Sequence, residues 1–166
     1  MDALDDLPGT VLADIWRLGP LLGAGGMGAV FAATHEISGE HAAVKIVLPD
    51  KLDDGGSLLP RFLREARLAS RIHHPHVVRV VSTGRWGPER DRYYLAMEKV
   101  DGLSLGDLVD APLTDGAIVG IACQILEALG HVHARGILHR DVKPDNVLVA
   151  RDAAGALHCK VMDFGI

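Results

Sequence analysis

The octapeptide His139-Arg140-Asp141-Val142-Lys143-Pro144-Asp145-Asn146, together with Asp163-Phe164-Gly165 farther along, decides the fold of this chain. Asp141 can accept a proton from a hydroxyl group, and Asn146 and Asp163 offer the hard oxygen ligands that Mg²⁺ prefers. Phosphoryl transfer needs little covalent chemistry from a protein and much positioning of charge. The two motifs together therefore predict a site of this kind.

The segment between the two motifs has the pattern of a β-hairpin. Val147-Leu148-Val149 and the run 157–162 are the predicted strands, and Asp152-Ala153-Ala154-Gly155 contains turn-forming residues. Because a hairpin returns the chain beside its start, we expect Asp163 alongside Asn146. A lone Asp-Phe-Gly is more often a plain turn after a strand, so the prediction depends on its spacing from the octapeptide.

Composition sets the outer bounds. The chain has 166 residues, of which 48% are apolar and 23% charged, which suits one domain with a sizeable core. The net charge of -5 argues against a nucleic-acid partner. Cys123 and Cys159 have no metal-type spacing, and the acidic start lacks the features of a signal peptide. We therefore expect a cytoplasmic location, and no membrane segment, since no run of about eighteen apolar residues is present.

The glycine-rich run Gly23-Ala24-Gly25-Gly26-Met27-Gly28 has two interpretations. It matches the dinucleotide-binding pattern, with a helix over 29–34 and Asp50 as a ribose ligand. Alternatively, residues 16–22 and 29–34 are antiparallel strands, and the glycines let the backbone fold over phosphates. Pro20 argues against a buried central strand. The glycines alone do not choose between the two, but the downstream motifs favour the strands.

A lysine and a glutamate extend the pattern. The segment 41–48 alternates as a strand that carries Ala43, Lys45 and Val47 on one face. The segment 58–72 has helical spacing and places Glu65 among apolar neighbours. A lysine on an apolar strand can reach water by snorkelling, but a buried carboxylate requires a cation, so we expect Lys45 and Glu65 to pair.

These motifs, taken in order, resemble those of the eukaryotic-type serine/threonine protein kinases that bacteria also carry. The resemblance covers residues 16–166, and Lys143 is the mark of the serine/threonine type. The Gly-Gly-Met-Gly run and the excess of arginine over lysine resemble bacterial members. The matching segments are Gly23 to Val30 for the glycine-rich loop, Ala43-Val44-Lys45 for the lysine strand, 61–66 for the αC helix, Tyr94 to Val100 for the gatekeeper and hinge, and the two motifs quoted first.

The resemblance implies an α+β, protein-kinase-like fold. It predicts an N-terminal tail at 1–15, a small lobe at 16–98 with an antiparallel sheet and the αC helix, and a hinge at 99–101. An incomplete, mainly helical large lobe is predicted at 102–166, ending at Asp-Phe-Gly.

The resemblance also implies ATP, Mg²⁺ and a protein substrate with a serine or threonine hydroxyl. The implied catalytic residues are Asp141, Lys143, Lys45 and Glu65, and the implied metal ligands are Asn146 and Asp163. The residues expected to bind the nucleotide are Leu22, Gly23, Gly25, Gly28, Val30, Ala43, Lys45, Met97, Glu98, Val100 and Leu148.

The remaining elements have structural interpretations. Thr114 is expected to cap a long helix that ends near Arg135, with Gly136 as its stop. Ser104 is expected to cap a short helix over 105–110, and His139 to pack near Phe164. The expected core face of the long helix comprises Ile118, Ile121, Ala122, Ile125, Leu129 and Val132.

The run His73-His74-Pro75-His76 could suggest a metal site, but no carboxylate or cysteine lies at ligand spacing, so we predict a loop. The activation segment of the family does not follow Gly165. We therefore expect these 166 residues alone to expose an apolar patch on the long helix and not to phosphorylate proteins. The alternatives are a truncated or pseudokinase-like module that binds nucleotide without catalysis, and a small-molecule phosphotransferase of related fold, which typically lacks Arg140 and Lys143.

Overall fold

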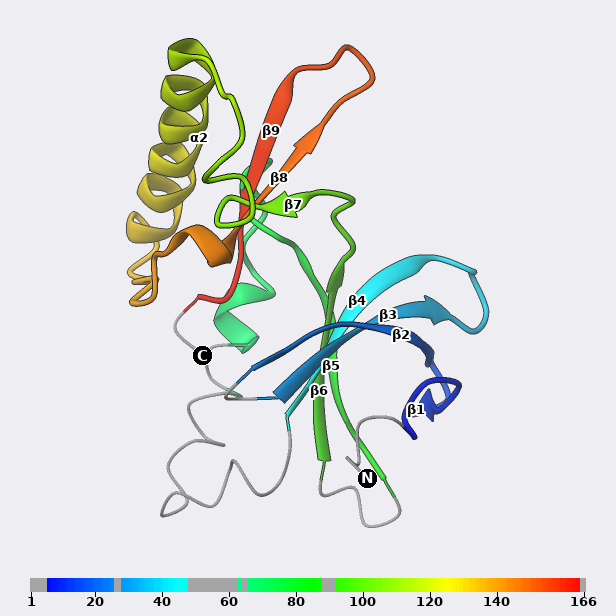
Figure 1. Ribbon diagram of the computed structural model, residues 1–166. Helices are drawn as coiled ribbons and strands as arrows, with labels where there is room; N and C mark the ends of the chain where they lie inside the picture. Colours follow the sequence, from blue (N-terminus) through cyan, green and yellow to red (C-terminus); the bar gives the residue numbers. More distant parts are fainter. Residues whose placement is uncertain (1–5, 26–27, 48–62, 64–65, 88–91, 165–166) are drawn as a thin grey trace. The chain divides into compact units, whose positions relative to one another are not determined.

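The computed structural model describes residues 6–25, 28–47, 63, 66–87 and 92–164. The chain divides into two compact units (Figure 1), which we describe separately. The first unit comprises residues 1–66 and 80–99, and the second comprises 67–79 and 100–166. The small lobe predicted at 16–98 includes residues 67–79, whereas the structure packs these residues in the second unit. The predicted α+β class is confirmed.

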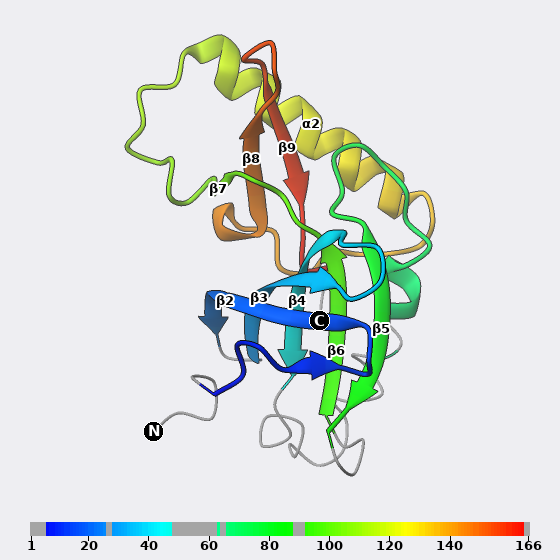
Figure 2. The same ribbon diagram turned by 90° about the vertical axis from the view of Figure 1, so that its right-hand side faces the viewer.

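The first unit is built on a six-stranded sheet whose neighbours all pair antiparallel (Figure 2). The strand order is β1-β2-β3-β4-β6-β5. The strands are β1 (Val11–Leu12), β2 (Trp16–Gly25), β3 (Gly28–His35), β4 (His41–Val47), β5 (Val80–Trp86) and β6 (Arg92–Glu98). The predicted strands at 16–22, 29–34 and 41–48 are therefore confirmed within the described residues.

The hydrophobic core of the first unit lies against one face of this sheet. Phe31 and Val44 are fully buried there, and Trp16 joins them from β2. Leu7 and Leu12 are buried in the same core, and β1 pairs with β2. The prediction of an N-terminal tail at 1–15 is therefore wrong for residues 6–15, because two leucines there bury their side chains against the sheet.

The glycine-rich run joins two strands, not a strand and a helix. Residues 28–35 form β3, which pairs with β2 across Gly25 and Gly28. Pro20 lies where the β2–β3 register shifts, and β1 reaches only as far as Arg17 along β2. The proline therefore occupies a place that needs no ladder donor. These facts exclude the dinucleotide-binding interpretation.

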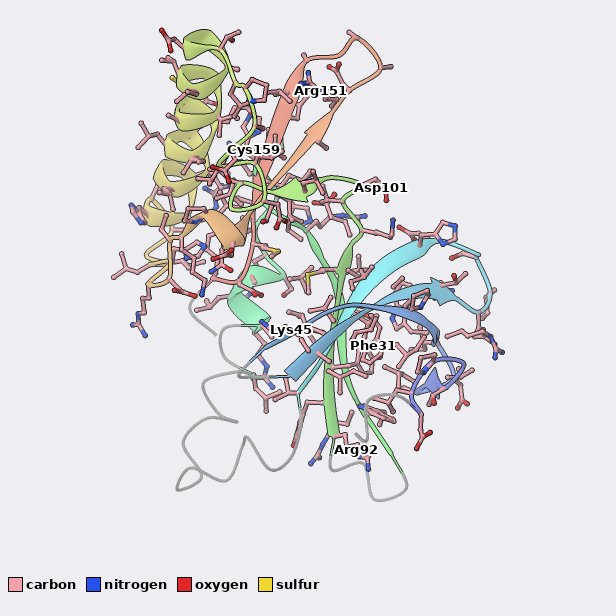
Figure 3. All side chains as sticks on the ribbon, viewed as in Figure 1. Phe31, Lys45, Arg92, Asp101, Arg151 and Cys159 are labelled. Atoms are coloured by element: carbon pink, nitrogen blue, oxygen red, sulfur yellow. The ribbon has the colours of Figure 1, made fainter. Side chains whose placement is uncertain are left out.

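The second unit packs the helix α2 (Asp115–His133) against a three-stranded sheet of order β7-β8-β9. The strands are β7 (Leu103–Ser104), β8 (Val147–Arg151) and β9 (Leu157–Val161), and a 3₁₀ turn, η2 (Pro144–Asn146), precedes β8. Gln124 of α2 donates to the Leu157 carbonyl at 3.0 Å and accepts from the Cys159 amide at 2.7 Å. Cys159 is buried between β9 and α2 (Figure 3).

The boundaries predicted for α2 are confirmed, but its buried face is displaced. The Thr114 side chain accepts the Ala117 amide, and Gly136 adopts a φ of 72° just after the helix. The fully buried positions are Ile121, Ala128 and Val132. Two residues assigned to the core face, Ile118 and Ala122, are exposed instead, because the helix turns the face around Gln124 toward β9.

The helix predicted over 105–110 does not form. Ser104 does cap this segment by accepting the Asp107 amide at 3.0 Å. The bonds that follow run from Leu108 to Leu105 and from Val109 to Gly106, which is the spacing of successive tight turns. Gly106 weakens a helix that would span fewer than two turns.

About half of the predicted helix over 58–72 lies outside the described residues. Residues 66–69 are helical, and Ala66, Ala69 and Ile72 bury their side chains. Glu65 and Gly165 lie outside the described residues, as do Gly26 and Met27. The predicted pairing of Lys45 with Glu65 therefore stays a prediction.

Candidate phosphoryl-transfer site

We call the octapeptide 139–146 the catalytic loop. Three of its residues are joined by an ion pair and hydrogen bonds. The Lys143 Nζ atom lies 2.9 Å from Oδ2 of Asp141. The Asn146 amide nitrogen donates to the same oxygen at 3.0 Å and to the Asp141 carbonyl at 2.8 Å. Asn146 is buried, whereas Asp141 and Lys143 keep about half of their side chains exposed. The carboxylate is thus fixed in orientation and still accessible to a hydroxyl group.

Local backbone geometry brings these residues together. Pro144 begins η2, where its fixed φ suits the first turn and its missing N–H is not needed. The backbone N–H of Asn146 then donates to the Lys143 carbonyl at 3.0 Å. This turn directs the side chain of Asn146 back toward Asp141. Arg140 adopts a φ of 65°, a conformation that non-glycine residues hold only where surrounding contacts fix it.

This arrangement shifts the pKa of both partners in the direction that favours their charged forms. The hydrogen bond from Lys143, followed by that from Asn146, lowers the pKa of Asp141 below its ordinary value. The hydrogen bond to Asp141 raises the pKa of Lys143 in turn. At neutral pH the loop therefore presents an ionised carboxylate beside an ammonium group.

His139 connects the two motifs. Its Nε2 atom lies 2.9 Å from the Met162 carbonyl, and its Nδ1 accepts the Asp141 amide at 3.3 Å. Its ring packs 4.6 Å from the ring of Phe164, centroid to centroid. Burial lowers the pKa of His139, so the ring is neutral and can accept from the Asp141 amide. The expected structural role of His139 is confirmed.

The predicted hairpin forms, and its second strand ends beside the residue at which its first strand begins. Val147 pairs with Val161, and the Met162 amide bonds the Asn146 carbonyl at 2.9 Å. Asp163 follows directly with a φ of 57°. The second motif therefore lies beside the end of the first, as the spacing predicted.

In the first unit, strand register gathers the predicted nucleotide-binding residues. Lys45 pairs with Val30 of β3 and with Leu95 of β6, and Ala43 pairs with Met97. Directly opposed residues of antiparallel strands project from the same face. We call the face that carries Val30, Ala43, Lys45 and Met97 the Lys45 face.

The Lys45 face lies opposite the hydrophobic core. Phe31 pairs with Val44 and belongs to the core, and Figure 3 shows Phe31 and Lys45 on different sides of the strands. Lys45 is only 8% exposed, so its stem is packed along the sheet. A buried ammonium group on a face without the main core is suited to a phosphate ligand.

The described glycines of the run 23–28 differ in the space available for a side chain. A Cβ atom on Gly28 would lie 1.9 Å from the Ile46 carbonyl oxygen, so this residue must be glycine for β3 and β4 to approach. A Cβ atom on Gly23 or Gly25 would meet nothing within 4 Å. Among the described glycines of this run, packing requires a glycine only at Gly28. The backbone at Gly23 and Gly25 is open to a ligand.

The other predicted nucleotide-binding residues lie on strands of both units or shortly after one. Leu22 is 53% exposed on β2 beside the glycines. Glu98 ends β6, and Val100 begins the following segment of the second unit. Leu148 pairs with Ser104 and Lys160 in the small sheet of the second unit.

Sequence reasoning missed one function of Asn146. It was predicted only as a metal ligand, yet its amide nitrogen also fixes the orientation of Asp141. Because the nitrogen faces Asp141, the amide oxygen points away from that carboxylate and stays suited to a cation. The proline two positions before Asn146 was the available signal, since it predicts the turn that brings the side chain back.

A model of the protein kinase domain matches residues 16–166. This chain belongs to the protein kinase family. Its fold agrees with solved kinase domains. The kinase domain of PknI from Mycobacterium tuberculosis is 31% identical, with a TM-score of 0.78 over 95% of this chain and 61% of that one. A structure of Rad53 in complex with AMP-PNP is 32% identical, with a TM-score of 0.74 over 90% of this chain and 38% of that one.

Bacterial kinases are similar in sequence. Serine/threonine-protein kinase Pkn1 of Myxococcus xanthus is 42% identical over the whole chain, which covers 23% of that protein. Serine/threonine-protein kinase PknB of Mycolicibacterium smegmatis is 39% identical over 93% of this chain and 24% of its own length. The kinase chain thus spans about a quarter of the relatives it matches. The predicted membership of the eukaryotic-type serine/threonine kinases is confirmed.

Proposed function

We propose that this chain carries the catalytic loop and nucleotide-binding face of a kinase that phosphorylates protein serine or threonine hydroxyls. The observation that supports this most strongly is the triad of Asp141, Lys143 and Asn146. It holds an ionised, half-exposed carboxylate beside a cation, which is what hydroxyl activation and charge neutralisation require.

The proposed reaction transfers the γ-phosphoryl group of ATP. The substrate hydroxyl oxygen forms a bond to the γ-phosphorus as the bond between that phosphorus and the β,γ-bridging oxygen breaks, and ADP leaves. Asp141 orients the hydroxyl and accepts its proton. Lys143 neutralises charge on the transferred group, and Lys45 holds the α- and β-phosphates.

The residues present fit Mg²⁺ held jointly with a nucleotide. The Asn146 amide oxygen and the Asp163 carboxylate are hard ligands that flank the hairpin. Within the described ranges, no group of three or more histidine, cysteine, aspartate or glutamate residues could hold a metal by itself. Mg²⁺ commonly binds through one or two protein oxygens plus substrate phosphates, which agrees with this pattern. Mg²⁺ would supply charge neutralisation at the phosphates.

The decisive experiment measures transfer of ³²P from γ-labelled ATP with Mg²⁺ to a serine- and threonine-rich protein substrate. It compares the 166-residue chain with a chain extended to the length of the solved kinase domains that it matches, at equal concentration. Phosphoserine or phosphothreonine formed by the extended chain supports the proposal. Nucleotide binding without any transfer by the extended chain would contradict it.

The second candidate function is nucleotide binding without catalysis. It is favoured by the Lys45 face and the open backbone at Gly23 and Gly25, which belong to the first unit and do not include Asp141. Calorimetric titration of the 166-residue chain with a non-hydrolysable ATP analogue and Mg²⁺ tests it separately. Binding by this chain, together with transfer only by the extended chain, would assign binding to these residues and catalysis to the larger domain.

We also propose a cytoplasmic location, which the free thiols of Cys123 and Cys159 support. The helix α2 is long and apolar enough to cross a membrane by length and composition, and 17% of its most apolar window is buried. A core helix meets the same criterion, so this is weak support for a membrane segment. Fractionation of cells that produce the tagged chain tests the location.

A further inference from the structure

Four histidines of the second unit form a cluster that the proposed reaction does not use. The His74 ring lies 4.7 Å from the His131 ring and 5.6 Å from the His76 ring, centroid to centroid. The His76 ring stacks 6.3 Å from that of His158. These four residues, the histidine cluster, come from the loop at 73–79, from the last turn of α2 and from β9.

The hydrogen bond at His74 requires a neutral ring. The His76 amide donates to Nδ1 of His74 at 3.2 Å, so a neutral His74 carries its hydrogen on Nε2. A second proton would have to occupy Nδ1 and would remove this acceptor. In the described part of the chain, Nε2 of His131, whose ring packs against that of His74, is buried without a hydrogen-bond partner.

The charges around His74 oppose its protonation on balance. His76 faces it from its own loop, and His131, Glu127 and Arg135 face it from α2 and the residues just after that helix. Glu127 alone favours the charged form. Burial and the neighbouring His131 and His76 outweigh it and lower the pKa of His74 below its ordinary value.

His76 links the cluster to β9. Its Nδ1 lies 3.0 Å from the Cys159 carbonyl, and its Nε2 lies 3.8 Å from Glu127, whose side chain is 64% exposed. His158 stacks on His76, and its Nε2 lies 3.1 Å from Asp152. The carboxylates of Glu127 and Asp152 thus lie at the rim of the cluster, next to His76 and His158.

The same loop is tied to β9 through its backbone. The Val78 amide donates to the Val161 carbonyl at 2.9 Å, and the Val161 amide donates to the His76 carbonyl at 2.9 Å. Val77 forms a parallel bridge with Val161. Val77 also buries its side chain in the apolar core of the second unit. The histidine rings add a contact that responds to pH to this apolar and backbone anchor.

We propose that the histidine cluster is a pH-sensitive latch: a neutral His74, packed on His131 and accepting the His76 amide, helps to hold the loop at 73–79 on α2 and β9, and its protonation releases the loop. The latch is separate from the residues assigned to phosphoryl transfer. The loop continues along the chain into β5 of the first unit. Release therefore frees the segment through which the chain passes from the second unit to the first.

The direction of the pH dependence follows from linkage. Above the ordinary histidine pKa of 6.5, His74 is neutral whether the loop is held or released, and the latch is fully effective. As the pH falls below 6.5, the released loop binds protons more readily than the held loop, so release becomes more favourable. The effect is complete once the pH passes below the lowered pKa of the held state.

Hydrogen exchange followed by NMR tests the latch in the 166-residue chain between pH 7.5 and 5. After correction for intrinsic exchange chemistry, we expect the opening constants of the Val78 and Val161 amides to rise as the pH falls below 6.5. The rise is up to about tenfold per pH unit for each proton taken up on opening. The amide of Ile46 in β4 is the internal reference and should show no such trend.

The His74→Asn substitution separates titration from packing, because the asparagine Oδ1 can accept the His76 amide without titrating. It should flatten the pH dependence at Val78 and Val161, whereas His133→Asn, an exposed position on the same helix as His131, should leave it unchanged. Opening constants that are independent of pH in the original chain, or equally pH-dependent in His74→Asn, would overturn the latch.

A titration of the imidazole ¹⁵N signals in the unaltered chain keeps the test decisive if His74→Asn fails to fold. The expected result is a His74 ring with hydrogen on Nε2 and a pKa below the ordinary histidine value of 6.5. A His74 ring that titrates at or above 6.5, or that carries its neutral-state hydrogen on Nδ1, would also overturn the proposal.

Discussion

In the catalytic loop, Asp141, Lys143 and Asn146 lie within five positions of one another and are joined by direct hydrogen bonds. On the Lys45 face, Val30, Lys45 and Met97 come from three strands, and their common orientation follows from the register of β3, β4 and β6. The loop is therefore specified by local chemistry, whereas the face is specified by the packing of the whole sheet. Substitutions in the two regions should fail in different ways.

The largest difference is expected at Asp141. In the extended kinase domain, Asp141→Ala should lower turnover about 10²- to 10⁴-fold, as loss of a general base does, while nucleotide affinity changes little. Single-turnover phosphoryl transfer and calorimetric nucleotide binding measure the two quantities. If Asp141→Ala weakened nucleotide binding as much as turnover, the loop would depend on the wider fold as the Lys45 face does.

The second test compares two glycines of the first unit. Gly28→Ala should destabilise the first unit by about 2 to 3 kcal/mol, because the new Cβ meets the Ile46 carbonyl oxygen in a backbone conformation that favours glycine. Gly23→Ala, at an open position, should change stability by no more than about 0.5 kcal/mol. Urea unfolding followed by tryptophan fluorescence measures both. Equal losses would show that the glycine-rich run is needed throughout for folding.

The third test uses neighbouring residues on opposite faces of β4. Ala42→Val overpacks the core and should cost about 1 to 2 kcal/mol of stability. Ala43→Val, on the Lys45 face, should weaken nucleotide binding about tenfold at a smaller cost in stability. Urea unfolding and calorimetry of both variants provide the comparison. A stability loss at Ala43→Val as large as that at Ala42→Val would show that the Lys45 face is core.

The smallest expected effect is a shift in the pKa of Asp141. Lys143→Met should raise the pKa of Asp141 toward its ordinary value of 3.8, because the Lys143 hydrogen bond is the main cause of its lowering. The stabilisation that Asp141 gives the fold is present above pH 3.8 and is lost as the pH falls through its lowered pKa, and this dependence should shrink in the variant.

A ¹³C NMR titration of the carboxyl groups measures the shift. Asp152 is the internal control, because its pKa is lowered by bonds within its own hairpin, chiefly from Ala156, and should not move. An Asp141 titration that is unchanged in Lys143→Met would mean that the ion pair does not set the charge of the loop.

Much of the second unit could be predicted from the sequence because its signals are local. The hairpin of β8 and β9 follows from its turn residues, the ends of α2 from Thr114 and Gly136, and the grouping of Asp141 with Asn146 from a few positions of spacing. Interactions between near neighbours in the chain need no knowledge of distant segments.

Other features depended on partners far away in the chain. Which side of α2 is buried, and so the exposure of Ile118, was decided by the bonds between Gln124 and β9. The burial of Leu7 and Leu12 in residues predicted to be a tail was decided by the sheet that they cover. Periodicity indicates that a face is apolar, but it does not indicate which segment will cover it.

By itself the sequence determined the family, the strands β2 to β4, the helix α2, the hairpin of β8 and β9, and the chemistry of the catalytic loop. These features depend on residue type and on short spacings along the chain. The tertiary structure alone decided the register that places Val30, Ala43 and Met97 beside Lys45, and it alone assembled the histidine cluster from three distant segments. The physical reason is that each apolar surface can be covered by any of several segments. Which segment covers it depends on the packing of the whole chain.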